Sequence, residues 1–139
     1  MRRLFCAGVI VAALCAGPTL AGVVEDAEGV WEYDPDTRRQ DDDMTCDGRP
    51  LRIEVDAPAK TYRSRRDPAG EWNVADILEV QADRFRIQYR GEERTTEAGE
   101  IVEWWFVMAA PDAFYWLRAD WPSWGMTDFR LRCHEPLSS

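Results

Sequence analysis

Short runs of alternating apolar and charged residues, separated by turn-forming stretches, restrict the fold of this chain more than any other feature of its sequence. In residues 51–56 and 84–90 every second side chain is apolar, a pattern typical of a β-strand with one face in water. The same criterion predicts eight strands, at residues 29–33, 51–56, 61–65, 71–80, 84–90, 100–108, 113–119 and 126–134. Because closure removes the exposed edges of a meander, these strands predict an all-β fold, an antiparallel up-and-down barrel of eight strands.

The first 21 residues have the composition of a secretory signal peptide. Arg2 and Arg3 precede an uncharged run, and small residues predict cleavage near Ala21. The run is shorter than the roughly 20 residues of a bilayer-spanning helix, so we expect a periplasmic or secreted protein with no stable membrane insertion. Leu14 stands where a lipoprotein signal has a small residue, which argues against lipidation of Cys15. The predicted organisation is a signal peptide (1–21), a short lead-in (22–28) and a single barrel domain (29–139).

Two of the four cysteines, Cys6 and Cys15, lie in the predicted signal peptide, which leaves Cys46 and Cys133 as one pair. In an oxidising compartment we expect these two residues to form a disulfide. The bridge would tie the beginning of the domain to its end, which favours closure, and would stabilise the fold by roughly 4 to 5 kcal/mol. Free thiols or a metal-binding pair are the alternatives. Because no zinc-site spacing of histidine and cysteine accompanies the pair, we expect neither a metal nor a cofactor.

The chain is acidic, with a formal net charge of −9 that becomes −11 when Arg2 and Arg3 leave with the signal peptide. Such a chain repels phosphate groups, which argues against nucleic acid and anionic lipid as partners. The acidic segment 34–43 lacks the glycine and terminal glutamate of a dedicated calcium loop, so we interpret it as a solvated loop. The expected partner is a small-molecule ligand or an envelope protein, and the protein is expected to be a monomer or a dimer.

The Gly-Val-Trp triplet at residues 29–31 resembles the Gly-x-Trp motif in the first strand of the lipocalin and wider calycin group. In that group an arginine from the end of the barrel packs on the tryptophan, and Arg130 or Arg132 is the candidate here. The resemblance implies a calycin-like barrel that can hold one small apolar ligand. Cys46 and Cys133 are also similar in placement to the cysteines of bacterial lysozyme-inhibitor barrels, although the Ser-Gly-x-Arg-Tyr loop of those inhibitors is absent.

The single histidine, His134, lies next to Cys133 near the C-terminus, so neither a serine or cysteine triad nor a histidine metal site has its parts. We therefore expect a binding protein and not an enzyme. The favoured function is the binding of a small apolar or aromatic ligand, or of an envelope protein, at the open end of the barrel. The alternative is a secreted or periplasmic inhibitor or assembly module that acts through an outward tryptophan patch.

Candidate ligand-binding residues are aromatic side chains and one carboxylate that the alternation places inside the barrel or on the loop above it. Asp76 falls on the predicted inward stripe opposite Tyr89, where a buried carboxylate needs a hydrogen-bond donor from the ligand or the protein. Core packing is the alternative role of the inward tryptophans, and loop 120–125 is expected to form a lid or a stacking platform. The full set is Trp31, Trp72, Asp76, Tyr89, Trp104, Tyr115, Trp121 and Trp124.

Hairpin registers predict an ionic network on the outer face of the barrel. A two-residue turn at residues 98–99 and a loop at residues 109–112 would place Glu103 between Arg94 and Arg118. One carboxylate would then join two guanidiniums across three strands.

The same registers predict an apolar patch on the outer face. They would set Trp105 beside Trp116 and Val107 beside Phe114, on strands whose other outward residues are charged. Exposed patches of this kind commonly contact a partner, so these four residues are the predicted partner surface.

The hairpin that turns at residues 82–83 gives a further register. It would pair Glu79 with Arg86 on the outer face and Leu78 with Ile87 on the inner face. An opposite-charge pair outside and an apolar pair inside both agree with a barrel wall.

Overall fold

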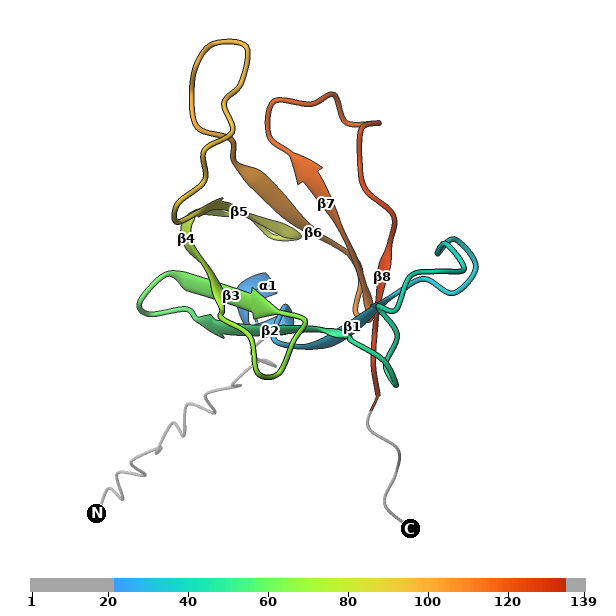
Figure 1. The fold of residues 1–139 in the computed structure, drawn as a ribbon. Coiled ribbons are helices and arrows are strands. Elements are labelled where there is room, and N and C mark those ends of the chain that lie inside the picture. The colour runs from blue at the N-terminus through green and yellow to red at the C-terminus, as the bar shows by residue number, and fades with distance from the viewer. Residues whose placement is uncertain (1–21, 135–139) are drawn as a thin grey trace, which may run out of the picture.

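The structure, a computed structural model, describes residues 22–134 as a closed barrel of eight antiparallel strands in up-and-down order (Figure 1). Each strand pairs with the next one along the chain, and β8 pairs with β1. The strands are β1 (Gly29–Tyr33), β2 (Leu51–Asp56), β3 (Thr61–Arg65), β4 (Asn73–Val80), β5 (Arg84–Tyr89), β6 (Trp104–Ala110), β7 (Ala113–Arg118) and β8 (Arg130–Arg132). A short helix, α1 (Val23–Asp26), precedes β1. The predicted all-β fold and its eight-stranded barrel are confirmed.

The predicted strand bounds agree best in the first half of the barrel, where β1, β2 and β3 have the predicted residues. β6 begins later than predicted because residues 95–101 form the tip of the β5–β6 hairpin. β8 has only three residues, because the segment before it contacts β7 at Thr127 without forming a regular ladder. There the Thr127 amide donates to the Trp116 carbonyl, and the Trp116 amide donates to Thr127 Oγ1.

A β-bulge between Ile77 and Glu79 decides which residues of β4 face the core. The predicted Glu79–Arg86 pair forms, with an ion pair of 3.2 Å between the side chains. Past the bulge, Ile77 and not Leu78 lies opposite Ile87, so Ile77 is buried and Leu78 is 46% exposed. The predicted inward position of Leu78 is therefore wrong. In the part of β4 that precedes the bulge in the chain, each side chain faces the side opposite to the predicted one.

A second register shift, between Met108 and Ala110, has the same effect on the β6–β7 hairpin. It places Trp116 opposite Phe106 and Phe114 opposite Met108. Both Phe114 and Trp116 are buried and belong to the core cluster. One extra residue is enough to turn them inward, because side chains alternate between the two faces of a strand with a period of two.

The core is packed with aromatic rings toward the end of the barrel where α1 lies. Phe106 stacks with Phe85 and with Phe114, at ring-centroid distances of 4.8 and 4.1 Å, and Trp31 meets Phe114 edge-on at 4.8 Å. The valines of α1 are buried in the same cluster, and Trp31 Nε1 donates to the Ala27 carbonyl at 3.0 Å. Figure 1 shows α1, in blue, against the interior of the barrel. This end is therefore closed.

The predicted disulfide joins Cys46 to Cys133, with Cα atoms 5.6 Å apart. The Cys133 amide donates to the Val30 carbonyl, and the Cys46 amide donates to the Glu32 carboxylate, so both halves of the bridge are held on β1. The bridge ties the β1–β2 loop to the chain that follows β8.

The predicted signal peptide and its cleavage point lie outside the described residues. Within residues 22–134 we find no helix that is both long and apolar enough to cross a bilayer. The disulfide is compatible with export to an oxidising compartment.

Candidate functional site

The end of the barrel opposite α1, which we call the mouth, is surrounded by loops and lined by polar and aromatic side chains. Odd-numbered strands end here and even-numbered strands begin here. Directly opposed residues of antiparallel strands share a face, so the pairing of Arg130 with Tyr33 and with buried Phe114 points Arg130 and Tyr33 inward. The inward residues nearest this end form what we call the mouth layer: Tyr33, Tyr62, Ser64, Tyr89, Trp104, Trp116 and Arg130.

Arg130 is a buried cation in the mouth layer, with only 9% of its surface exposed. Its Nη1 donates to Thr127 Oγ1 at 2.8 Å and to the Asp128 carbonyl, and its guanidinium carbon lies 4.6 Å from the Tyr33 ring centroid. Nη2 has a long contact of 3.5 Å with the Tyr33 hydroxyl, and Nε has no hydrogen-bond partner. Burial lowers the pKa of Arg130 from its usual value, but a guanidinium stays charged at neutral pH.

Tyr62 and Tyr89 bring two further hydroxyl groups into the mouth layer. Tyr62 has no exposed surface, its hydroxyl has no hydrogen-bond partner, and its ring lies 6.3 Å from Tyr89 and 5.9 Å from Trp116. Burial raises the pKa of Tyr62 well above its usual value and also raises the pKa of Tyr89, while Ser64 next to them partly opposes both shifts. Both tyrosines therefore stay protonated at neutral pH and can donate hydrogen bonds to a ligand.

Trp104 connects the mouth layer to the loops around it. Its Nε1 is buried without a partner, and its ring meets Trp121 of the β7–β8 loop edge-on at 5.7 Å. The guanidinium carbon of Arg94, from the β5–β6 connection, lies 5.6 Å from the Trp104 ring. Hydrogen bonds of 2.7 Å from Arg94 hold Glu92 and lower the pKa of Glu92 to about 2. The structure thus brings the predicted residues Trp104 and Trp121 together at the mouth.

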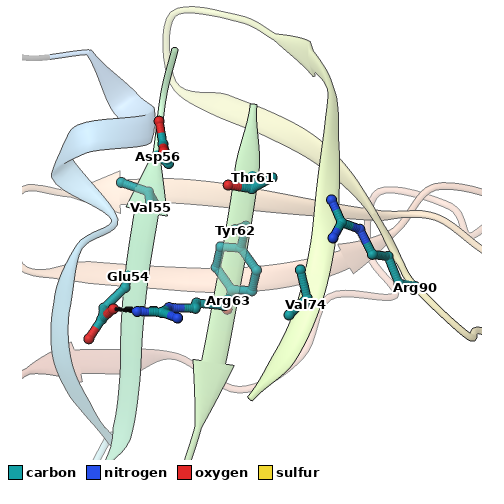
Figure 2. A pocket seen from close by; sticks show the side chains of 8 residues that line it. All are labelled: Glu54, Val55, Asp56, Thr61, Tyr62, Arg63, Val74 and Arg90. Carbon is teal, nitrogen blue, oxygen red and sulfur yellow. Dashed lines mark hydrogen bonds and ion pairs between the residues drawn. The ribbon is translucent and has the colours of Figure 1, made fainter. Parts of the chain in front are cut away.

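A groove of about 460 Å³ crosses the outer face of β2, β3 and β4 (Figure 2). Figure 2 shows the Arg63 guanidinium reaching across to Glu54, with which it forms an ion pair. Arg90, at the other side of the groove, binds Asp76 at 2.8 Å. Because these four charged groups already satisfy one another, the groove offers a ligand less than the mouth layer, where buried donors lack partners.

Asp76 does not lie in the barrel interior, and its predicted role there is wrong. It is exposed, it pairs across the strands with Gln88 and not with Tyr89, and its carboxylate is bound by Arg90. The hydrogen bond from Arg90 lowers the pKa of Asp76. The physical reason is the β4 bulge, which exchanges the two faces of this strand.

Trp72 and Tyr115 also lie on the outer face and not inside as predicted. The guanidinium carbons of Arg63 and Arg65 lie 4.4 and 4.2 Å from the Trp72 ring centroid. Tyr115 packs edge-on against Phe129 at 5.6 Å. The β4 bulge displaces Trp72 from the interior, and the shift between Met108 and Ala110 that turns Trp116 inward turns Tyr115 outward.

The predicted ionic network of Arg94, Glu103 and Arg118 does not form. The hairpin tip has a three-residue loop at 97–99, in which Gly99 has a φ of 80°, and the Val102 amide donates to the Arg94 carbonyl. The register therefore differs by one residue from the predicted one. Each member has another partner: Arg94 binds Glu92 at 2.7 Å, Glu103 binds Arg86 at 3.0 Å and Arg118 binds Asp120 at 2.7 Å.

The predicted partner surface of Trp105, Val107, Phe114 and Trp116 is not an exposed patch. Phe114 and Trp116 point into the core, and Val107 on the outer face is buried by its neighbours. Trp105 is half-buried, with a guanidinium carbon 5.4 Å from its ring. Large apolar exposure occurs on the β7–β8 loop instead, where Trp124 is 82% exposed.

Trp31 is a core residue at the closed end and does not reach the mouth. The guanidinium carbon of Arg132 lies 4.2 Å from its ring, so Arg132 is the arginine that packs on the tryptophan. Arg130 does not pack on Trp31 but on Tyr33, in the mouth layer. Its role, and those of Tyr33, Tyr62 and Ser64, were missed by the sequence analysis, although the alternation in residues 29–33 and 61–65 marks these last three as inward.

Among residues 22–134, one group of potential metal ligands within 4.8 Å of one another consists of Glu32, Cys46 and Cys133. The two sulfur atoms of this group are bonded to each other. The mouth layer therefore remains the best candidate for a binding site, with one buried cation, three tyrosines and two tryptophans.

No protein-family model, no curated protein and no solved structure matches this chain.

Proposed function

We propose that this protein is an exported, non-enzymatic binding protein that holds a small ligand with an apolar or aromatic body in the mouth layer. The observation that carries this proposal is that three buried donors there, the Tyr62 hydroxyl, Trp104 Nε1 and Arg130 Nε, have no hydrogen-bond partner. Leaving a buried donor unsatisfied costs about 1 to 3 kcal/mol, so a ligand that accepts from these groups would recover that free energy. The surrounding rings supply apolar contact area.

The lipocalin-like resemblance supports the same proposal. The Gly-x-Trp triplet at residues 29–31 lies at the start of β1, and Arg132 packs on Trp31 as the resemblance implies. We therefore propose that the chain is a small lipocalin-like protein whose ligand enters at the mouth. Export through residues 1–21 is part of the proposal, because a stable disulfide needs an oxidising compartment.

An envelope protein as partner is the second candidate, and the rim of the mouth favours it. Trp121 and Trp124 on the β7–β8 loop are 42% and 82% exposed, and Met126 on the same loop is 38% exposed. Exposed tryptophans are common anchors of protein interfaces. Native mass spectrometry of protein purified from its own host separates the two candidates, because a co-purifying small mass supports the ligand and a hetero-complex supports the partner.

Ligand binding can be tested with N-phenyl-1-naphthylamine, an uncharged dye whose emission rises in apolar surroundings. We expect a saturable rise in emission with the exported protein. Trp104→Ala should weaken dye binding about tenfold, because it removes an aromatic wall of the mouth layer. Trp72→Ala is the matched control, since it removes the same side chain from the outer face. An absence of saturable binding, or equal weakening in both variants, would contradict the proposed function.

A further inference from the structure

We infer that the ligand of the mouth layer carries a carboxylate, or a similar planar oxyanion with one negative charge, that pairs with Arg130. This inference rests on the proposed function and adds the charge and shape of the ligand's polar end. It is carried by the geometry of one guanidinium and by the groups around it.

The Arg130 guanidinium is buried, is anchored at one nitrogen and lacks a strong hydrogen bond along its opposite edge. Nη1 is held by Thr127 Oγ1 and by the Asp128 carbonyl. Nε and Nη2 share the opposite edge, because Nη2 lies trans to Cδ, and their N–H bonds are parallel. Nε has no partner, and Nη2 has only the 3.5 Å contact with Tyr33. Two parallel N–H groups match the two oxygens of a carboxylate, which arginine binds in this bidentate manner.

The positive charge of Arg130 has no counterion among the described residues within ion-pair distance. Asp128 contributes its backbone carbonyl, and its carboxylate acts on Arg130 only from beyond ion-pair distance. The other contacts of Arg130 are hydroxyl groups and an aromatic ring. Removing a guanidinium from water is strongly unfavourable unless an opposite charge approaches it. At the rim, by contrast, Arg94 and Arg118 are each held by a carboxylate at 2.7 Å. Arg130 is therefore the arginine of the mouth that is prepared for an external anion.

A single negative charge with an apolar body fits the rest of the mouth layer. One guanidinium neutralises one charge, and the unpartnered Tyr62 hydroxyl can donate a further hydrogen bond nearby. The acidic chain, with a net charge of −9, repels ligands of higher negative charge. Trp104 and Trp116 offer ring surfaces to an aliphatic or aromatic body.

The test is displacement of bound N-phenyl-1-naphthylamine from the exported protein by matched acids and alcohols. Decanoate is compared with decanol, and indole-3-acetate with indole-3-ethanol, so that each pair shares a carbon skeleton. We expect each acid to displace the dye at a concentration at least about tenfold lower than its alcohol, because hydrogen bonds between charged partners are the stronger ones.

Substitutions locate the effect at Arg130. Arg130→Gln should abolish the preference for the acid, measured within that variant as the ratio of the acid and alcohol concentrations that displace the dye. Arg130→Lys keeps the charge but loses the two-nitrogen edge, so it should retain part of the preference. Arg90→Gln is the matched control, because it removes an exposed arginine and changes the net charge equally, and its acid preference should equal that of the unmodified protein.

The possible outcomes separate the inference from the proposed function. If the dye binds and the acids compete no better than the alcohols, the inference is overturned and the binding function stands. If neither the dye nor any of the four compounds binds, the proposed function itself fails. If Arg90→Gln reduces acid preference as much as Arg130→Gln, the effect is one of net charge and the pairing with Arg130 is wrong. Should Arg130→Gln not fold, the acid and alcohol comparison in the unmodified protein and in Arg130→Lys decides the question.

Discussion

The guanidinium carbon of Arg132 lies 4.2 Å from the centroid of the Trp31 ring, and its Nη atoms donate to the carbonyls of Glu28 and Asp26. One side chain of β8 thereby contacts β1, the last residue of α1 and the connection between these two elements. Since β8 has only three residues, side-chain contacts of this kind reinforce the few backbone hydrogen bonds that close the barrel.

We expect Arg132→Met to lower the free energy of unfolding by about 2 to 4 kcal/mol, because it removes the cation–π contact and leaves carbonyls without their donor. Urea denaturation followed by tryptophan fluorescence measures this change. Arg52→Met is the control, since Arg52 is exposed on the outer face, and it should change stability by less than about 0.5 kcal/mol. Equal effects of the two substitutions would show that the Trp31 contact does not stabilise the barrel.

Removal of the disulfide should have a larger effect. The bridge joins residues 87 positions apart, and a loop of that length predicts a loss of about 4 to 5 kcal/mol when both Cys46 and Cys133 are replaced by serine. The measurement is denaturation of the double variant beside the oxidised protein, with the reduced protein as a further comparison. Equal stability of the oxidised and reduced forms would contradict the prediction.

The register of the β6–β7 hairpin can be tested by comparing two tryptophans. Trp116→Ala should cost about 3 to 5 kcal/mol because Trp116 is packed in the core, whereas Trp105→Ala on the outer face should cost roughly 1 to 2 kcal/mol. Thermal and denaturant unfolding of both variants give the comparison. If Trp105→Ala lowered the stability more than Trp116→Ala, Trp116 would lie on the outer face and the β6–β7 hairpin would lack the bulge.

Acid should weaken the contact between Glu92 and Arg94. The pKa of Glu92 lies at about 2, below its ordinary 4.5, so its stabilising effect is complete above about pH 4.5 and is lost as the pH falls toward 2. Because the Arg94 side chain is 59% exposed, solvent screening limits this effect to about 1 kcal/mol or less. Glu92→Gln should remove this part of the pH dependence, while Glu93→Gln should leave it. A carboxyl titration of Glu92 by NMR with a midpoint near 4.5 would exclude the strong bond from Arg94.

The sequence alone was sufficient for elements that local pattern controls. Strict alternation and turn-forming residues predicted β1, β2 and β3 with their observed bounds, and the cysteine count predicted the disulfide. The bulges at Ile77/Glu79 and Met108/Ala110 were not predictable in this way, because each adds one residue that the alternation of apolar and polar side chains does not mark.

The same limit explains the errors in the candidate site. Asp76, Trp72 and Tyr115 were placed inside by counting residues from a turn, and one extra residue reverses that count. That Arg130 has no carboxylate within ion-pair distance could not be predicted either, because this depends on the three-dimensional positions of the acidic side chains.

Because α1 occupies one end of the barrel, a ligand of the proposed kind would have to enter and leave by the other end, past the loop that carries Trp121 and Trp124. Association and dissociation would then use the same opening, so an obstruction there would slow both.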